Sequence, residues 1–211
     1  MIDLYTAATP NGQKASIMLE ECGLEYSVHA LNLGAGEQHS AHYLQLNPNG
    51  KIPTIVDNDV QGDAITVFES GAILTYLAEK TGRFLPTEAR ARAAVLSWLN
   101  WQMGALGPML GQAWHFGKTA PEKVDYAIKR YVTESVRLLS VMDQQLNRTE
   151  FLAGDEVSIA DFACYGWTRS GLGAVQEIGG AMPTLPHVSR WLNAVGGRDG
   201  VQKGMAVPKQ D

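Results

Sequence analysis

Cysteine is scarce in this sequence, and its scarcity excludes two kinds of architecture. Only two of the 211 residues are cysteines, Cys22 and Cys164. Both stand in apolar helical patterns far apart in the chain, so we expect buried free thiols and no disulfide framework. The histidines are scattered and form no cluster with metal-ligand spacing. We therefore expect neither a disulfide-stabilised scaffold nor a metal site.

The sequence also has few charged residues and no long run of apolar residues. Charged residues make up 18% of the chain, the net charge is -5, and no basic stripe could neutralise phosphates, so we expect no nucleic-acid partner. No run of about 18 apolar residues could span a membrane. The N-terminus lacks the charged and apolar regions of a secretory signal. We expect a soluble cytoplasmic protein with no membrane partner and a substantial core.

Strand and helix patterns alternate over residues 1–82. The first strand, Ile2–Tyr5, leads into a helix whose apolar residues fall at helical spacing and which ends at Gly23. The order β-α-β-α-β-β-α predicts a small mixed sheet covered by helices, with a right-handed parallel β-α-β half and an antiparallel hairpin. The other expected elements are strands at Glu25–Leu31, Pro53–Asp57 and Ile65–Phe68, a glycine-rich loop at Leu33–Gln38, and helices at Ala41–Leu46 and Glu69–Lys80.

The chain becomes entirely helical in its second part, so we predict two domains, 1–82 and 88–211. A long helix is expected from Glu88 to about His115, with a bend near Gly104, Gly107 and Pro108. Three more helices are expected: one at Pro121–Asn147, one opened by the capping box Ser158-Ile159-Ala160-Asp161, and one starting at Pro186.

The turn Thr9-Pro10-Asn11-Gly12 is the first candidate for chemistry. It opens a helix, where backbone N–H groups and the helix dipole favour negative charge. Thr9 and Asn11 add two small polar side chains at this point. Because no cysteine lies near the turn, a thiol that is activated here must come from a ligand.

Two further motifs carry both a functional and an ordinary interpretation. A cis bond at Ile52-Pro53 would expose the Ile52 backbone to a peptide-like ligand, whereas the ordinary alternative is a trans proline in a loop. Glu69 and Ser70 at a helix start could bind the ammonium and carboxylate of an α-amino-acid group. Alternatively, Glu69 interacts with the helix dipole and Ser70 caps the helix.

The helical part offers two weaker candidates. Arg130 could reach the cleft between domains and bind a carboxylate, or it could form an exposed pair with Glu134 four residues later. Trp114, His115 and Phe116 could form a pocket wall, or they could pack in the core.

Together these pieces resemble the cytosolic glutathione transferases over nearly the whole chain. The implied fold class is an α/β thioredoxin-like N-terminal domain plus an all-α C-terminal domain, assembled as a homodimer. More specific motifs resemble the bacterial Nu class, which is related to the fungal nitrogen-regulator prion protein. These motifs are Thr9-Pro10-Asn11-Gly12, Lys51-Ile52-Pro53, Phe68-Glu69-Ser70-Gly71-Ala72-Ile73, Gly107-Pro108-Met109-Leu110-Gly111-Gln112 and Tyr126-Ala127-Ile128-Lys129-Arg130-Tyr131.

The resemblance implies glutathione, as the thiol or the disulfide, as the ligand, and it assigns roles along the chain. Thr9 and Asn11 would be catalytic and would hydrogen-bond the glutathione sulfur region. Ile52, beside a cis Pro53, would pair its backbone with the cysteinyl unit. The remaining implied glutathione contacts are Gln38, Glu69, Ser70 and Arg130.

Members of the Nu class act mainly as glutathione-dependent disulfide-bond reductases, with some peroxidase and modest conjugating activity. We therefore expect an enzyme that uses the thiolate of bound glutathione, without a protein cysteine, on small-molecule disulfides or organic hydroperoxides. Two alternatives stay open. One is conventional conjugation of electrophiles, with an acceptor pocket near Trp114, His115 and Phe116. The other is a non-catalytic glutathione-binding or regulatory protein of the same fold.

Overall fold

The computed structural model describes residues 1–209, which fall into two compact units. The first unit contains Met1–Leu85 together with the segment from Gly197 onward. The second unit contains Pro86–Gly196. Among the described residues, no helix is long and apolar enough to cross a membrane.

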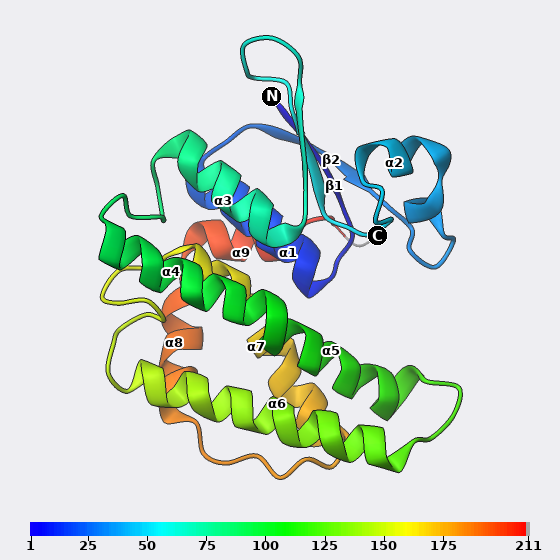
Figure 1. Ribbon diagram of the computed structural model, residues 1–211, viewed down its shortest axis with the longest axis vertical. Coiled ribbons are helices and arrows are strands. Elements are labelled where there is room, and N and C mark those ends of the chain that lie inside the picture. The colour runs from blue at the N-terminus through cyan, green and yellow to red at the C-terminus, as the bar shows by residue number, and fades with distance from the viewer. Residues whose placement is uncertain (210–211) are drawn as a thin grey trace. The chain divides into compact units, whose positions relative to one another are not determined.

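The first unit is built on a four-stranded mixed sheet with the order β2-β1-β3-β4 (Figure 1). β1 (Ile2–Thr6) pairs in parallel with β2 (Tyr26–Ala30) and antiparallel with β3 (Thr54–Asp57). β3 also pairs antiparallel with β4 (Ile65–Phe68), so the hairpin is confirmed. The parallel pair needs a crossover, which is supplied by α1 (Pro10–Cys22).

The core of the first unit lies between this sheet and the helices α1 and α3 (Ser70–Thr81), which contact each other. Alternate residues of β1 are buried, as expected for a strand with one face on the core. The short helix α2 (Ala41–Leu46) has the predicted bounds. The loop expected at Leu33–Gln38 runs into a 3₁₀ turn, Glu37–His39. Fully buried apolar side chains include Leu4, Ala15, Ile17, Met18, Leu19, Ile55, Ile73, Leu74 and Leu77.

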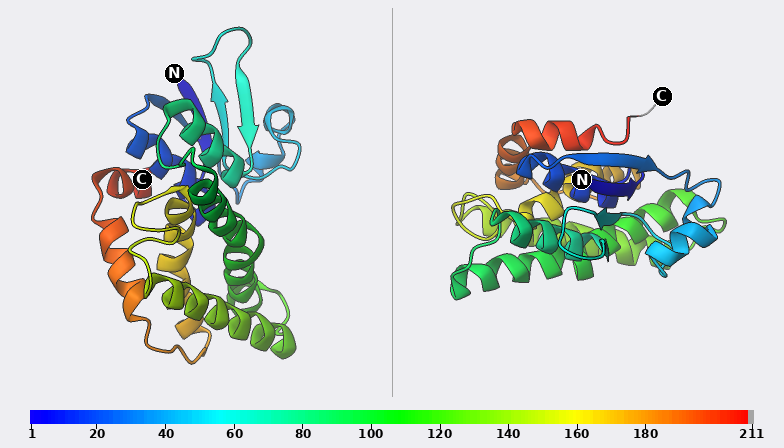
Figure 2. Two further views of the ribbon diagram at one scale, coloured as in Figure 1. Left: turned by 60° about the vertical axis from the view of Figure 1, so that its left-hand side comes forward. Right: turned by 90° about the horizontal axis from the view of Figure 1, so that it is seen from above.

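The end of the chain differs from the predicted boundary of the helical domain. The sequence analysis placed it in that domain, but α9 (Asp199–Met205) packs against α1 of the first unit (Figure 2). The Ser16 hydroxyl donates to the carbonyl of Gly204 at 2.7 Å, and Arg198 forms two hydrogen bonds with the Glu21 carboxylate. The two helices can approach this closely because Gly204 of α9 has no side chain where it meets Ile17 of α1.

We expect Gly204→Ala to destabilise the first unit by about 1–3 kcal/mol. An added Cβ would lie 2.5 Å from the backbone nitrogen and Cα of Ile17, so α9 would have to move away from α1. Hydrogen exchange of α1 and α9 amides measures the loss directly. Gly173→Ala in a helix of the second unit is a matched control: no heavy atom lies within 4 Å of its added Cβ, so it should stabilise by about 0.5–1 kcal/mol. Equal stability of Gly204→Ala and the parent would contradict this packing.

The second unit is helical, as predicted. The helix expected over Glu88 to His115 comprises α4 (Ala89–Trp101), a π-helical segment at Gln102–Leu106 and α5 (Gly107–Trp114). A second π-helical segment, His115–Thr119, extends the run beyond the predicted end. The two glycines and the proline therefore mark a change of helical type within a continuous helical run.

Three further helices complete the second unit: α6 (Asp125–Leu146), α7 (Ile159–Glu177) and α8 (Pro186–Gly196). The capping box at the start of α7 is confirmed. Asp161 is completely buried and accepts four hydrogen bonds, from the backbone N–H and hydroxyl of Ser158, the N–H of Leu152 and the indole N–H of Trp191. One carboxylate thus fixes the start of α7, the preceding loop and α8.

Candidate functional site

The turn before α1 is shaped by Thr9, which is the N-cap of that helix. Its hydroxyl oxygen accepts a hydrogen bond from the N–H of Gly12 at 3.2 Å. A hydroxyl also has one hydrogen to donate, so capping leaves Thr9 able to donate to an anion. An added Cβ at Gly12 would collide with the carbonyl oxygen of Ala7 and the hydroxyl of Thr6. This close approach of helix and strand fixes Thr9 and Asn11 at the end of β1.

The cysteine of the first unit, Cys22, does not lie at this turn. Cys22 is the last residue of α1, about 16 Å from Asn11 at the usual helical rise. Its sulfur lies 3.4 Å from the Thr81 hydroxyl, and burial raises the pKa of the Cys22 thiol. Cys164 is buried in α7 of the second unit. The expectation of a turn without a protein thiol therefore holds in three dimensions within the first unit.

The segment before β3 is held by side chains of α2 and the turn that follows it. The carbonyl of Lys51 accepts hydrogen bonds from the Tyr43 hydroxyl and the Asn47 amide, both at 2.6 Å. The Tyr43 hydroxyl also lies 2.9 Å from that of Thr54. The next peptide bond, Ile52–Pro53, is cis, so the ordinary trans alternative is wrong.

Glu69 and Ser70 stand where β4 becomes α3. Ser70 is the first residue of α3 and Glu69 holds the N-cap position, so the alternative in which Ser70 caps the helix is wrong. Glu69 has φ 68° and ψ 118°, a conformation that costs free energy for any residue with a Cβ. Its exposed carboxylate makes no capping bond and accepts a hydrogen bond from Asn49 at 3.3 Å. Ser70 is buried and accepts a hydrogen bond from the Lys14 ammonium at 3.3 Å.

Gln38 lies in the 3₁₀ turn before α2. Its side-chain nitrogen donates to the Leu33 carbonyl at 3.5 Å. Its side-chain oxygen is buried and has no hydrogen-bond partner among the described residues. A buried acceptor without a donor is rare in proteins, and a ligand N–H would satisfy it.

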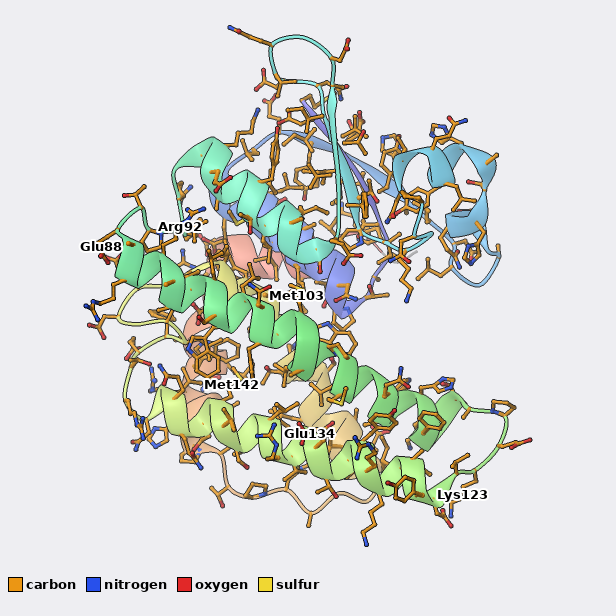
Figure 3. All side chains as sticks on the ribbon, in the orientation of Figure 1. Glu88, Arg92, Met103, Lys123, Glu134 and Met142 are labelled. Atoms are coloured by element: carbon orange, nitrogen blue, oxygen red, sulfur yellow. The ribbon has the colours of Figure 1, made fainter. Side chains whose placement is uncertain are left out.

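The second unit carries the remaining candidates. The predicted alternative of an Arg130–Glu134 pair is wrong, because Glu134, which is labelled on α6 in Figure 3, accepts two hydrogen bonds of 2.8 and 2.7 Å from Arg137. The Arg137 bonds, more than the charge of Arg130, lower the pKa of Glu134. Arg130 is exposed, and the ion-pair partner of Glu134 among the described residues is Arg137.

The predicted aromatic residues gather at the end of α5. The Phe116 ring stacks on Tyr131 with centroids 5.5 Å apart, and His115 meets Phe116 edge-on at 5.0 Å. Trp114 is 42% exposed, so it is not a core residue. Tyr131, which follows Arg130 directly, was not among the candidates. Among the described residues, no group of three or more His, Cys, Asp or Glu could hold a metal.

Sequence comparison supports this arrangement. The N-terminal domain model of glutathione S-transferase matches residues 1–79, and the C-terminal domain model matches residues 107–199. The chain therefore belongs to the glutathione S-transferase family.

Two relatives and two solved structures of that family are similar to this chain over most of its length. The disulfide-bond oxidoreductases YfcG and YghU of Escherichia coli are 48% and 43% identical, over 94% and 98% of this chain and 91% and 74% of theirs. A Burkholderia graminis glutathione transferase with two glutathione molecules per subunit has a TM-score of 0.93 at 42% identity, covering 100% of this chain and 89% of that one. A Pseudomonas putida transferase with one glutathione disulfide per subunit has a TM-score of 0.92 at 39% identity, covering 98% and 91%. These neighbours, with Ure2p-type structures among them, agree with the Nu-class resemblance.

Three residues of the site region were missed by sequence reasoning. Lys14, Tyr43 and Asn47 are each 2% exposed, and each binds a residue of a predicted motif or its neighbour. The turn motif Asn47-Pro48-Asn49-Gly50 beside Ile52-Pro53 could have indicated Asn47. Nothing in the sequence marks the lysine as buried.

Proposed function

We propose that this protein is an enzyme that reduces disulfide bonds with glutathione, and that the bound glutathione supplies the reacting thiolate. The observation that carries the proposal is the helix start at Thr9 and Asn11, which has anion-binding geometry and no thiol of the first unit beside it. The names of YfcG and YghU and the glutathione found in the neighbouring structures support the same chemistry.

In this proposal each glutathione contact has a physical reason. The helix dipole and the donors at Thr9 and Asn11 lower the pKa of the glutathione thiol. The backbone of Ile52, beside Pro53, pairs with the cysteinyl unit. Glu69 binds the ammonium of the γ-glutamyl end and Ser70 its carboxylate. Gln38 accepts from a ligand N–H, and Arg130 binds a glutathione carboxylate.

The reaction proceeds by two thiol–disulfide exchanges. The first glutathione thiolate attacks one sulfur of the substrate disulfide, which forms a mixed disulfide and releases a substrate thiolate. A second glutathione thiolate then attacks the glutathione sulfur of the mixed disulfide. This step releases the second substrate thiolate and leaves glutathione disulfide. Two glutathiones thus supply the two electrons, and the protein contributes position and electrostatics.

The same thiolate could attack the terminal oxygen of an organic hydroperoxide, which breaks the O–O bond and gives an alcohol and the sulfenic acid of glutathione. A second glutathione thiolate then attacks that sulfur, which yields glutathione disulfide and water, so we include hydroperoxides as second substrates. We also propose a homodimer in the cytoplasm, where glutathione keeps thiols reduced. The edge strand β4 presents Ile65 and Phe68, which are 41% and 38% exposed, as apolar surface that a second copy could cover.

One assay tests the proposed reaction against its main alternative. Turnover of glutathione with 2-hydroxyethyl disulfide should exceed conjugation of glutathione to an aryl halide. The aromatic cluster of Phe116 and Tyr131 gives the conjugating alternative an apolar surface, and faster conjugation would favour it. Failure to bind glutathione below about millimolar concentration would favour a regulatory protein.

The Cys22→Ala/Cys164→Ala double variant should retain disulfide reduction, with kcat/KM within about twofold of the parent. Cys22 ends α1 far from Thr9, Cys164 is buried in α7, and the Cys22 thiol is less acidic than a free cysteine because it is buried. Steady-state kinetics with 2-hydroxyethyl disulfide measure the effect, and circular dichroism verifies that the variant is folded. Loss of most turnover in the folded variant would show that a protein cysteine takes part.

A further inference from the structure

The turn over residues 47–50 follows α2 and leads to the segment before β3, and the proposed function gives this turn no role. It is closed by the N–H of Gly50, which donates to the carbonyl of Asn47 at 3.0 Å. Asn47 is 2% exposed and holds both sides of the turn. Its side-chain nitrogen donates to the Lys51 carbonyl at 2.6 Å, and its side-chain oxygen accepts the N–H of Asn49 at 2.9 Å. Asn49 therefore has a fixed position relative to the backbone that leads into the cis peptide bond.

The side chain of Asn49 connects this turn to the start of α3. Its amide nitrogen donates to one carboxylate oxygen of Glu69, Oε1, at 3.3 Å. An ionised carboxylate can only accept hydrogen bonds, so the NH₂ end of the amide is the end that faces it. The two oxygens of a carboxylate together offer about four acceptor positions, and Asn49 uses one of them. The bond thus holds the carboxylate and leaves it able to accept from a ligand.

An exposed glutamate needs such a partner if it is to bind a ligand group at a defined point. Both Asn49 and Glu69 are exposed. A glutamate side chain has several rotatable bonds, and fixing them when a ligand binds costs conformational entropy. The bond from Asn49 restricts this rotation before the ligand arrives. The backbone of Glu69 is also held in one arrangement, with φ 68°.

We propose that Asn49 is a positioning residue for the γ-glutamyl ammonium of glutathione, acting through Glu69. This inference rests on the proposed function, in which Glu69 binds that ammonium. The Asn49 amide orients the carboxylate, and Asn47 joins Asn49 to the backbone before Ile52. The turn therefore sets the spacing between the proposed contacts for the cysteinyl unit and for the γ-glutamyl unit.

The experiment compares two ligands on three proteins by calorimetry. The ligands are glutathione and glutaryl-cysteinyl-glycine, which lacks only the amino group of the γ-glutamyl unit. Asn49→Ala should bind glutathione about fivefold more weakly than the parent and should bind the analogue within about twofold of the parent. Asn58→Ala is the matched control, because Asn58 is also exposed and donates to a carboxylate of the first unit, that of Asp3, at 2.8 Å. It should bind both ligands as the parent does.

A second comparison tests the path through Glu69. In a Glu69→Ala background, which has no carboxylate to orient, Asn49→Ala should weaken glutathione binding by less than about twofold, because the effects of coupled residues are not additive. An effect of Asn49→Ala as large in that background as in the parent would overturn the proposal.

The two ligands also separate this role from a structural one. Equal weakening of both ligands by Asn49→Ala would show that Asn49 only stabilises the turn, and the proposal would be wrong. Unchanged glutathione affinity in folded Asn49→Ala would also contradict it and would leave the proposed function standing. If the parent bound glutathione and the analogue equally well, Glu69 would not bind the ammonium, and the role of Asn49 would be lost with that contact. Failure of the parent to bind either ligand would instead overturn the proposed function.

Discussion

The Asp161→Ala variant is expected to lose about 4 kcal/mol or more of stability in the second unit. The substitution removes the acceptor for the N–H of Leu152, the N–H of Ser158 and the indole N–H of Trp191. Each of these donors lies in the interior and would become unsatisfied, at a cost of about 1–3 kcal/mol each. The start of α7, its preceding loop and α8 would lose their common connection.

The tryptophans allow this loss to be measured in one unit. All five, Trp98, Trp101, Trp114, Trp167 and Trp191, lie in the second unit, so denaturant titration followed by tryptophan fluorescence reports on that unit. Glu88→Ala is the matched control. The Glu88 carboxylate caps α4 through two backbone N–H groups but is exposed, so its removal should cost clearly less stability than the removal of Asp161 (Figure 3). Equal losses from the two substitutions would contradict the connecting role of Asp161.

The Asp161→Asn variant separates shape from charge. Burial raises the pKa of Asp161, although the four donors around it act in the opposite direction. Asparagine keeps one acceptor oxygen for Leu152 and Trp191 and avoids the burial of a charge. It also presents an amide donor to Ser158, which is unfavourable. We therefore expect a loss of stability smaller than that of Asp161→Ala.

Local signals in the sequence predicted the elements that local interactions stabilise. Gly23 ends α1 in the left-handed conformation, with φ 66°, as a C-cap glycine does. The β3–β4 hairpin and the capping box at Ser158 follow from neighbouring residues in the same way. The seven residues of α9 include Gly200 and Gly204, which disfavour a helix. That helix forms because it packs against α1, and no local pattern shows this.

The helical run of the second unit shows the same limit. Gly104, Gly107 and Pro108 predicted a bend, and at this place the chain changes to π-helix over Gln102–Leu106. The type of change depends on packing against neighbouring helices, so propensity alone could not give it. Along α6, Ser135, Leu139, Met142 and Leu146 are buried, whereas Ile128, Tyr131 and Val132, nearer its start, are half-buried.

Some residues of the candidate site could be predicted from short sequence motifs, whereas the contacts of others depend on how the helices pack. Ile52-Pro53 and Glu69-Ser70 were predicted as candidates, because each pair is recognisable from adjacent residues in the sequence. Lys14 and Ser70 are separated by 56 positions, and their contact exists only after α1 packs on α3. Arg130 and Glu134 have the spacing of an ion pair, yet Arg137 provides Glu134 with the better geometry. Spacing indicates which pairs can form, and rotamers and competing partners decide between them.

Glu69→Gly is expected to stabilise the first unit and to weaken glutathione binding about 100-fold. Glu69 has φ 68°, which glycine adopts without strain, so removing the Cβ should release about 1 kcal/mol after the entropy cost of glycine. The same substitution removes the carboxylate that is proposed to bind the γ-glutamyl ammonium. A charge-assisted hydrogen bond of this kind accounts for a loss of about 100-fold, or about 2.7 kcal/mol.

The Glu69→Ala variant distinguishes the two effects. Alanine also lacks the carboxylate, so it should lose as much affinity as glycine, but it retains a Cβ and hence the strained backbone. Hydrogen exchange of α3 amides and calorimetry with glutathione measure the two quantities separately. Equal stability of the glycine and alanine variants would show that the conformation of Glu69 stores no strain. If glutathione affinity were unchanged in both variants, the carboxylate would not bind the ligand. Stability gained and affinity lost at one position would mean that the strained turn is kept for binding, since the fold alone would be more stable without it.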